Sequence, residues 1–245
     1  TSMRRKCLGW PSLLGGLVLA AALAIWLTAL PVQAFGGEIR VVSDQQEVKF
    51  PGGLGFDLTA EADGEIVEVR LYYRALEDGI WSYAYPKFDP GQRITAILNL
   101  DTSGSVYLPP GTRVEYYYII RDSLGNEIQT SPATLEYADT RFQWNEVQAG
   151  PLVLRYHDIR ESRVTSVVNE VEPQLARIAR ILPAGDPAPM KGIIYNRRSE
   201  AVAAFPRQSQ TITAQGVYAG FSFPATGGFV GLGCQPRIIV HEAAH

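Results

Sequence analysis

The chain has 245 residues, of which 46% are hydrophobic and 19% are charged. This length has room for about two domains, and the composition lies well away from that of disordered proteins. The formal net charge of −3 becomes −6 when the three basic residues at positions 4–6 leave with the N-terminal segment, since −3 − 3 = −6. The charge balance therefore excludes nucleic acid and anionic membranes as expected partners.

Residues 1–34 have the pattern of a signal peptide. A basic start is followed by an apolar run from Leu13 to Leu30, and residues 32–34 (Val-Gln-Ala) form a small-residue cleavage pattern. We predict an exported protein whose mature form begins at Phe35. If the segment is kept, the apolar run is long enough to serve as an N-terminal membrane anchor. Both alternatives predict a secreted or cell-surface protein.

Residues 38–138 are predicted to form an all-β sandwich. About seven short stretches alternate apolar and polar residues, with Gly, Pro and Asp between them. In the clearest stretches the residues predicted to face the core are Val67, Val69, Leu71 and Tyr73; Ile94, Ala96, Leu98 and Leu100; and Val114, Tyr116, Tyr118 and Ile120. The pattern is similar to that of an immunoglobulin or fibronectin type III sandwich, in which Trp144 and the tyrosines are most simply core residues.

A second domain is predicted for residues 139–245, because the period of the apolar residues changes there. A strand at 152–157 precedes a long amphipathic helix that is interrupted at Pro173. Further strands are predicted at 192–195, 211–223 and 229–232, with a short helix at 200–205. Pro236 then opens a last helix, so the domain is predicted to be α+β.

The last helix carries the sequence His241-Glu242-Ala243-Ala244-His245, which matches HExxH. Residues four apart lie on one face of a helix, so both imidazoles can reach one zinc ion. Glu242 lies toward the same side and is predicted to act as the general base that takes a proton from a zinc-bound water. His241 and His245 are therefore predicted metal ligands, and Glu242 is the predicted catalytic residue.

With this motif, residues 139–245 resemble the peptidase MA-like, or gluzincin, zinc metallopeptidases of the thermolysin type. The resemblance implies a multidomain protein in which a β-sandwich precedes an incomplete α+β peptidase domain. It also implies a third zinc ligand, a Glu, and an oxyanion-stabilising residue from a following helix, and neither is present in this sequence. We therefore expect a fragment that is inactive by itself and belongs to a hydrolase acting on a peptide or protein substrate.

Other candidate residues have simpler explanations. His157, beside Asp158, is predicted to be a solvated strand end. Cys234 is alone in the mature chain, because Cys7 lies in the signal segment, and a lone thiol is more often packing than a ligand. The glycine-rich stretch 227–233 lacks a nucleotide-binding register, and is instead a candidate edge strand for an extended substrate.

Two alternatives to a peptidase remain open from the sequence. The first is a cell-surface binding protein in which the sandwich is the working part and the peptidase-like domain is inactive. The second is a sensor anchored through Leu13 to Leu30, which requires that the apolar segment is retained.

Overall fold

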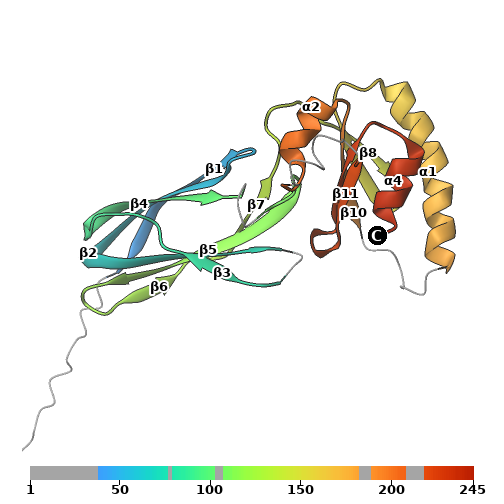
Figure 1. Cartoon of the computed structure of the whole chain (residues 1–245). Coiled ribbons are helices and arrows are strands. Elements are labelled where there is room, and N and C mark those ends of the chain that lie inside the picture. The colour runs from blue at the N-terminus through green and yellow to red at the C-terminus, as the bar shows by residue number, and fades with distance from the viewer. Residues whose placement is uncertain (1–37, 77–78, 103–106, 182–188, 208–217) are drawn as a thin grey trace, which may run out of the picture. The chain divides into compact units, whose positions relative to one another are not determined.

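The computed structural model describes residues 38–76, 79–102, 107–181, 189–207 and 218–245. The predicted signal segment and its cleavage site lie outside these residues. No helix within the described ranges is both long and apolar enough to cross a membrane. Residues 36–245 group into one compact unit, which contains two β-sheets (Figure 1).

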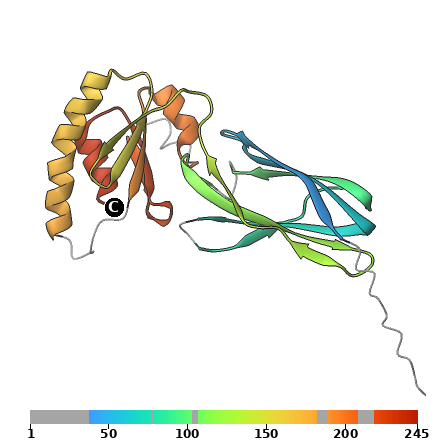
Figure 2. The ribbon, with the colours of Figure 1, turned by 180° about the vertical axis from the view of Figure 1, so that it is seen from behind.

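The first sheet is antiparallel and curls into a half-barrel (Figures 1 and 2). Its seven strands are β1 (Arg40–Lys49), β2 (Gly53–Ala75), β3 (Ser82–Ala84), β4 (Gly91–Asp101), β5 (Thr112–Asp122), β6 (Glu127–Gln129) and β7 (Ala133–Tyr137). Strands β1 and β4 flank the first part of β2, whereas β3 and β5 flank its second part. The prediction of an immunoglobulin-like sandwich is therefore wrong, because a single 23-residue strand joins what the sequence suggested were two sheets.

The join in β2 lies at Asp63-Gly64, two residues that are typical of a turn. The strand nevertheless continues through these two residues. Its register shifts between Glu61 and Ile66 against β4, and between Ile66 and Glu68 against β5. Such irregularities bend a strand and re-aim its side chains. As a result Val67 is 49% exposed instead of facing the core, while Val69 and Leu71 are buried as predicted.

The second sheet is mixed and has the strand order β11-β12-β10-β9-β8. Its strands are β8 (Asn145–Ala149), β9 (Leu152–Tyr156), β10 (Met190–Tyr195), β11 (Gly220–Phe223) and β12 (Gly228–Leu232). Parallel pairing joins β9, β10 and β12, and the outer strands are antiparallel. The glycine-rich stretch thus forms an inner strand, β12, and the expectation that it is an edge strand is wrong.

Helices cover both faces of the mixed sheet. The α-helices α1 (Glu161–Ile181) and α4 (Pro236–Ala243) share one buried cluster with Leu154 and Ile194. On the opposite face, a second buried cluster contains residues of the short helix α2 (Arg198–Ala201) and the 3-10 turn η1 (Val202–Ala204), together with Ile193 and Tyr195. A further 3-10 turn, η2 (Pro224–Thr226), links β11 to β12. The chain as described is mainly β, so the prediction of an incomplete thermolysin-like α+β domain is also wrong.

Helix α1 is amphipathic as predicted, and its buried stripe is formed by Val164, Val167, Val168, Val171 and Leu175. The predicted interruption at Pro173 does not occur, since the helix continues to Ile181. Pro173 is exposed, but it removes one helical hydrogen bond and crowds the preceding turn. Packing of the buried stripe therefore outweighs the local cost of the proline.

Pro173→Ala is expected to raise the free energy of unfolding by about 2 kcal/mol, because alanine restores the helical N–H and removes the steric clash. Urea denaturation followed by circular dichroism measures this change. Gln174→Ala, at the neighbouring exposed position, serves as the control and should change stability by less than about 0.5 kcal/mol. Equal stability of Pro173→Ala and the wild type would contradict this account of α1.

Candidate functional site

Helix α4 positions the HExxH residues at the C-terminal end of the described chain. Pro236 occupies its first turn, where a missing N–H costs nothing, and Ile239 is fully buried against the sheet. The Nε2 atoms of His241 and His245 lie 3.3 Å apart. Two imidazoles that bind one tetrahedral zinc ion at about 2.0–2.1 Å have nitrogens separated by roughly 3.3 Å, so this pair fits a shared metal ion.

Glu242 is held by strand β11. The Ser222 hydroxyl lies 2.7 Å from Glu242 Oε2 and 2.6 Å from the Glu242 carbonyl oxygen, either of which can accept its proton. Gly220 leaves the space that the carboxylate needs, because a Cβ atom there would lie 2.5 Å from Glu242 Oε1. Glu242 is therefore fixed beside the two histidines by a hydrogen bond and by close backbone approach.

The metal-ligand set is incomplete among the described residues, which hold no group of three or more His, Cys, Asp or Glu side chains suited to a metal ion. Cys234 is buried and free, its carbonyl accepts a hydrogen bond from Arg163, and burial raises the pKa of its thiol. His157 is also buried, contrary to the predicted solvated strand end; its ring stacks on Phe142 with 4.0 Å between centroids. Of the candidate ligands that the sequence offered within the described ranges, the structure brings together His241 and His245, with Glu242 beside them.

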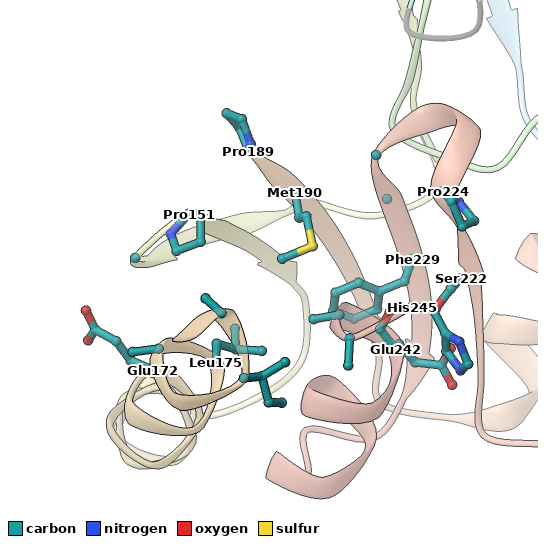
Figure 3. Close-up of a pocket in the computed structure, with 18 residues that line it drawn as sticks. Pro151, Glu172, Leu175, Pro189, Met190, Ser222, Pro224, Phe229, Glu242 and His245 are labelled. Atoms are coloured by element: carbon teal, nitrogen blue, oxygen red, sulfur yellow. Dashed lines mark hydrogen bonds between the residues drawn. The ribbon is translucent and has the colours of Figure 1, made fainter. Parts of the chain in front are cut away.

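A cavity of about 520 Å³ lies next to this group. Leu175 of α1, Met190 and Phe229 form apolar walls, while Ser222, Glu242 and His245 gather at one end (Figure 3). The cavity is thus mainly apolar, with one polar end.

A second candidate site lies on the outer face of the curled sheet, where five aromatic side chains form a patch. They come from β2, from β3 and the residues that flank it, and from β5. We define this aromatic patch as Tyr72, Trp81, Tyr83, Tyr85 and Tyr117. The strand register pairs Tyr72 with Tyr83 on one side and with Tyr117 on the other. Alternate residues of a strand share one face, so Trp81 and Tyr85 join Tyr83 on the same side.

The rings of the aromatic patch are in contact. Those of Tyr72 and Tyr117 stack with 5.1 Å between centroids and 6° between planes, and Trp81 meets Tyr117 edge-on at 4.9 Å. Tyr83 contacts both Tyr72 and Tyr85. Trp81, Tyr83 and Tyr85 nevertheless remain 37%, 59% and 58% exposed. Cross-strand aromatic pairs stabilise a sheet, yet this degree of exposure leaves ring surface available to a ligand.

Arg74 fixes the edge of the aromatic patch. Its guanidinium carbon lies 4.5 Å from the centre of the Trp81 ring, within cation–π range. The same guanidinium donates from Nε and Nη2 to Glu115 Oε2, at 2.7 and 2.6 Å. Trp81 is thereby held by a charged pair on the adjacent strands.

Sequence reasoning missed this site, since it assigned the sandwich tyrosines to the core. That is correct for Tyr116 and Tyr118, which are buried, but wrong for Tyr72, Tyr83 and Tyr117. One signal was present: in residues 81–85 (Trp-Ser-Tyr-Ala-Tyr), large aromatic residues alternate with small ones. This pattern predicts a strand with all its rings on one face.

No protein-family model and no curated protein matches the sequence. Among solved structures, a β-1,3-glucan binding domain of carbohydrate-binding module family 56 matches with a TM-score of 0.25 and 13% identity, covering 40% of this chain and 99% of its own. Polysaccharide deacetylases from Bacillus cereus and Bacillus anthracis match with TM-scores of 0.28 and 0.29, at 10% and 12% identity. Each covers 69% of this chain, which spans 54% of either deacetylase. TM-scores this low do not assign a function.

The predicted membership of the gluzincin peptidases is wrong on these findings. No family model supports it, and the described residues hold no complete metal-ligand cluster. The predicted function as a zinc metallopeptidase falls with it. What the described chain does present is a mainly β protein with two separate candidate sites, the histidine pair of α4 and the aromatic patch of the curled sheet.

Proposed function

We propose that this protein is a binding protein whose curled sheet holds a polysaccharide on the aromatic patch. The proposal agrees with the alternative from the sequence that the β-sheet domain is a binding domain. It does not include the inactive peptidase-like domain of that alternative. The observation that carries the proposal is the contiguous set of partly exposed rings that spans β2, β3 and β5. The weak likeness to glucan-binding structures is not part of the argument.

Sugar rings suit such a surface because each pyranose has a face of C–H groups that packs on the negative face of an aromatic ring. Its hydroxyl groups then need donors and acceptors at the rim. Arg70 donates to the Tyr72 hydroxyl at 3.1 Å, and Glu68 and Glu115 supply carboxylate oxygens on the same face. Flat rings bordered by fixed polar groups match an extended chain of sugars better than they match a purely apolar ligand.

Affinity electrophoresis in gels that contain laminarin, hydroxyethylcellulose, xylan or polygalacturonate tests the proposal, using the mature protein. Retardation by at least one polysaccharide is expected, with bovine serum albumin as the reference for unretarded migration. A proline-rich peptide is measured in parallel by calorimetry, because aromatic surfaces also hold such peptides. Binding of the peptide without binding of any polysaccharide would show that the proposal is wrong.

A zinc ion on His241 and His245 is a second proposal, favoured by the 3.3 Å separation of their Nε2 atoms. The two residues would hold the ion by neutral imidazole nitrogens, and the ion would supply a positive charge beside Glu242. With two protein ligands from the described residues, the affinity is expected to be weak. We propose no catalysis for this site.

His241→Ala is expected to lower the zinc affinity by about tenfold or more, because one of two ligand nitrogens is lost. Isothermal titration with zinc chloride measures the change. Glu242→Gln is the matched control, since it alters the neighbouring side chain but leaves both imidazoles, and it should bind zinc to within about threefold of the wild type. Zinc binding that is the same in His241→Ala and the wild type would rule out the pair as the site.

A further inference from the structure

We infer that the aromatic patch selects uncharged polysaccharides over acidic ones, because Arg70, Arg74 and Arg121 beside it already have carboxylate partners. This inference rests on the proposed function and adds the chemical class of the ligand. It concerns the outer face of β2 and β5, where charged residues continue the rows of aromatic residues. An acidic sugar chain would need free guanidinium groups there, whereas an uncharged chain needs hydrogen-bonding groups of both kinds.

The strand register sets this arrangement. Along β2 the residues on the outer face are Glu68, Arg70, Tyr72 and Arg74, and their partners in β5 are Arg121, Ile119, Tyr117 and Glu115. The stacked pair of tyrosines is therefore bordered by charged residues on both sides along the strands. Because both members of each pair point to the same face, opposite charges meet across the strands at both ends.

Each of these guanidinium groups is bound to a glutamate. Arg74 binds Glu115, and Arg70 Nη2 lies 2.5 Å from Glu68 Oε1. The hydrogen bond that Arg70 donates to Glu68, together with the one it donates to the Tyr72 hydroxyl, raises the pKa of Arg70, as expected for a guanidinium held by a carboxylate.

Arg121 lies between two carboxylates. It is 3.3 Å from Glu68 Oε2 and also pairs with Glu127 of β6, whose hydrogen bond raises the pKa of Arg121. Arg113, which follows at the end of the β5 row, also has an interaction partner.

The charges of these ion-paired residues cancel. Three arginines (Arg70, Arg74 and Arg121) face three glutamates (Glu68, Glu115 and Glu127), so their sum is zero. Recognition of carboxylate or sulfate groups uses the guanidinium fork, and here that fork is already filled. Displacing a glutamate would cost the charge-assisted hydrogen bonds that hold it. An uncharged sugar avoids this cost, since its hydroxyl groups can share the remaining donors and acceptors.

The Arg74–Glu115 pair is the one to test, because it lies directly beside Trp81. Its side chains are 27% and 19% exposed, so the pair is reachable by a ligand but is also shielded in part from salt. Glu115→Gln keeps the shape of the side chain and one acceptor oxygen, which leaves Arg74 close to its position over Trp81. It removes the negative charge and makes the Arg74 guanidinium available to an anion.

The experiment compares an uncharged polysaccharide, hydroxyethylcellulose or laminarin, with polygalacturonate at low and high salt. The wild type is expected to bind the uncharged polymer with little effect of salt and to bind polygalacturonate at least about tenfold more weakly. Glu115→Gln is expected to gain about tenfold in affinity for polygalacturonate at low salt and to lose that gain at high salt, so its preference for the uncharged polymer over polygalacturonate should narrow at low salt only.

Glu127→Gln is the matched control. It changes the net charge by the same amount, yet Arg121 keeps Glu68 as a partner, so no gain toward polygalacturonate is expected. Three outcomes would overturn the inference while the proposed function stands. The first is an equal gain in Glu127→Gln and Glu115→Gln, and the second is no gain in either variant. The third is wild-type binding of polygalacturonate that is sensitive to salt and as tight as binding of the uncharged polymer. Failure of the wild type to bind any polysaccharide would overturn both.

Discussion

Trp81→Ala is expected to weaken polysaccharide binding by about 30-fold, which corresponds to about 2 kcal/mol. Trp81 is 37% exposed, contacts the Tyr117 ring at its edge, and lies under the guanidinium of Arg74. Because these neighbours hold the ring in place before the ligand arrives, little side-chain entropy remains to be lost on binding. Affinity electrophoresis against the polymer that the wild type binds best measures the loss.

Ile97→Ala is the control for this prediction. Ile97 is 48% exposed on β4, in the part of the sheet that does not carry the aromatic patch, so its removal should leave binding unchanged to within about twofold. Circular dichroism of both variants should match the wild type. Unchanged binding by a folded Trp81→Ala protein would remove the aromatic patch as the binding surface.

Asp139→Ala is expected to lower the free energy of unfolding by about 3–5 kcal/mol, the largest loss of stability predicted here. Asp139 is 3% exposed and accepts hydrogen bonds from the Arg141 guanidinium at 2.9 and 2.7 Å, and from the Tyr195 hydroxyl at 2.7 Å. The variant leaves the buried Tyr195 hydroxyl without its acceptor and Arg141 without its counter-charge. Urea denaturation, followed by the fluorescence of nearby Trp144, measures the effect.

Asp158→Asn tests whether burial is the reason, since asparagine removes the charge but tolerates the positive φ of 51° at this position. Asp158 also pairs with an arginine, Arg197, but these side chains are 51% and 63% exposed. Water screens such a pair, so the loss should stay below about 1 kcal/mol. Similar losses in Asp139→Ala and Asp158→Asn would show that the buried network around Tyr195 does not have the role assigned to it.

Local signals in the sequence predicted most of the elements but not their assembly. The buried stripe of α1 and the inward row Val114, Tyr116, Tyr118 and Ile120 follow from periodicity alone. The curled sheet could not be predicted in this way, because alternation reports which face is buried and not whether two strands belong to one sheet. Asp63-Gly64 has the composition of a turn, and only its neighbours in space hold it in an extended strand. The predicted interruption of α1 at Pro173 is wrong for the same reason, since tertiary packing overrides the unfavourable helix propensity of proline.

The two candidate sites differ in how visible they are in the sequence. HExxH lies within five consecutive residues at the end of α4, where the helix ends at Ala243 and Ala244 is its cap, so its geometry follows from the last helical turn, and the close histidine pair appears where it was expected. The aromatic patch joins residues 72, 81–85 and 117, whose meeting depends on the register of three strands. Tyr72 and Tyr73 are adjacent and chemically identical, yet they point to opposite faces of β2. The alternation of apolar and polar residues predicts this difference and places Tyr73 in the core-facing row, but it does not reveal that Tyr72 meets Tyr83 and Tyr117, which depends on the strand register.

The long strand β2 has a consequence for how the protein is made. One part of the curled sheet contains β1 and β4, and the other contains β3 and β5. The strands of these two parts alternate along the chain, and β2 belongs to both. Neither part is a continuous segment, so neither can be completed on its own as the chain leaves the ribosome. The strands emerge in an order in which β2 must wait for residues up to position 101 to pair with β4 and up to position 122 to pair with β5. The curled sheet is therefore expected to form as a single cooperative unit, and the aromatic patch forms with it.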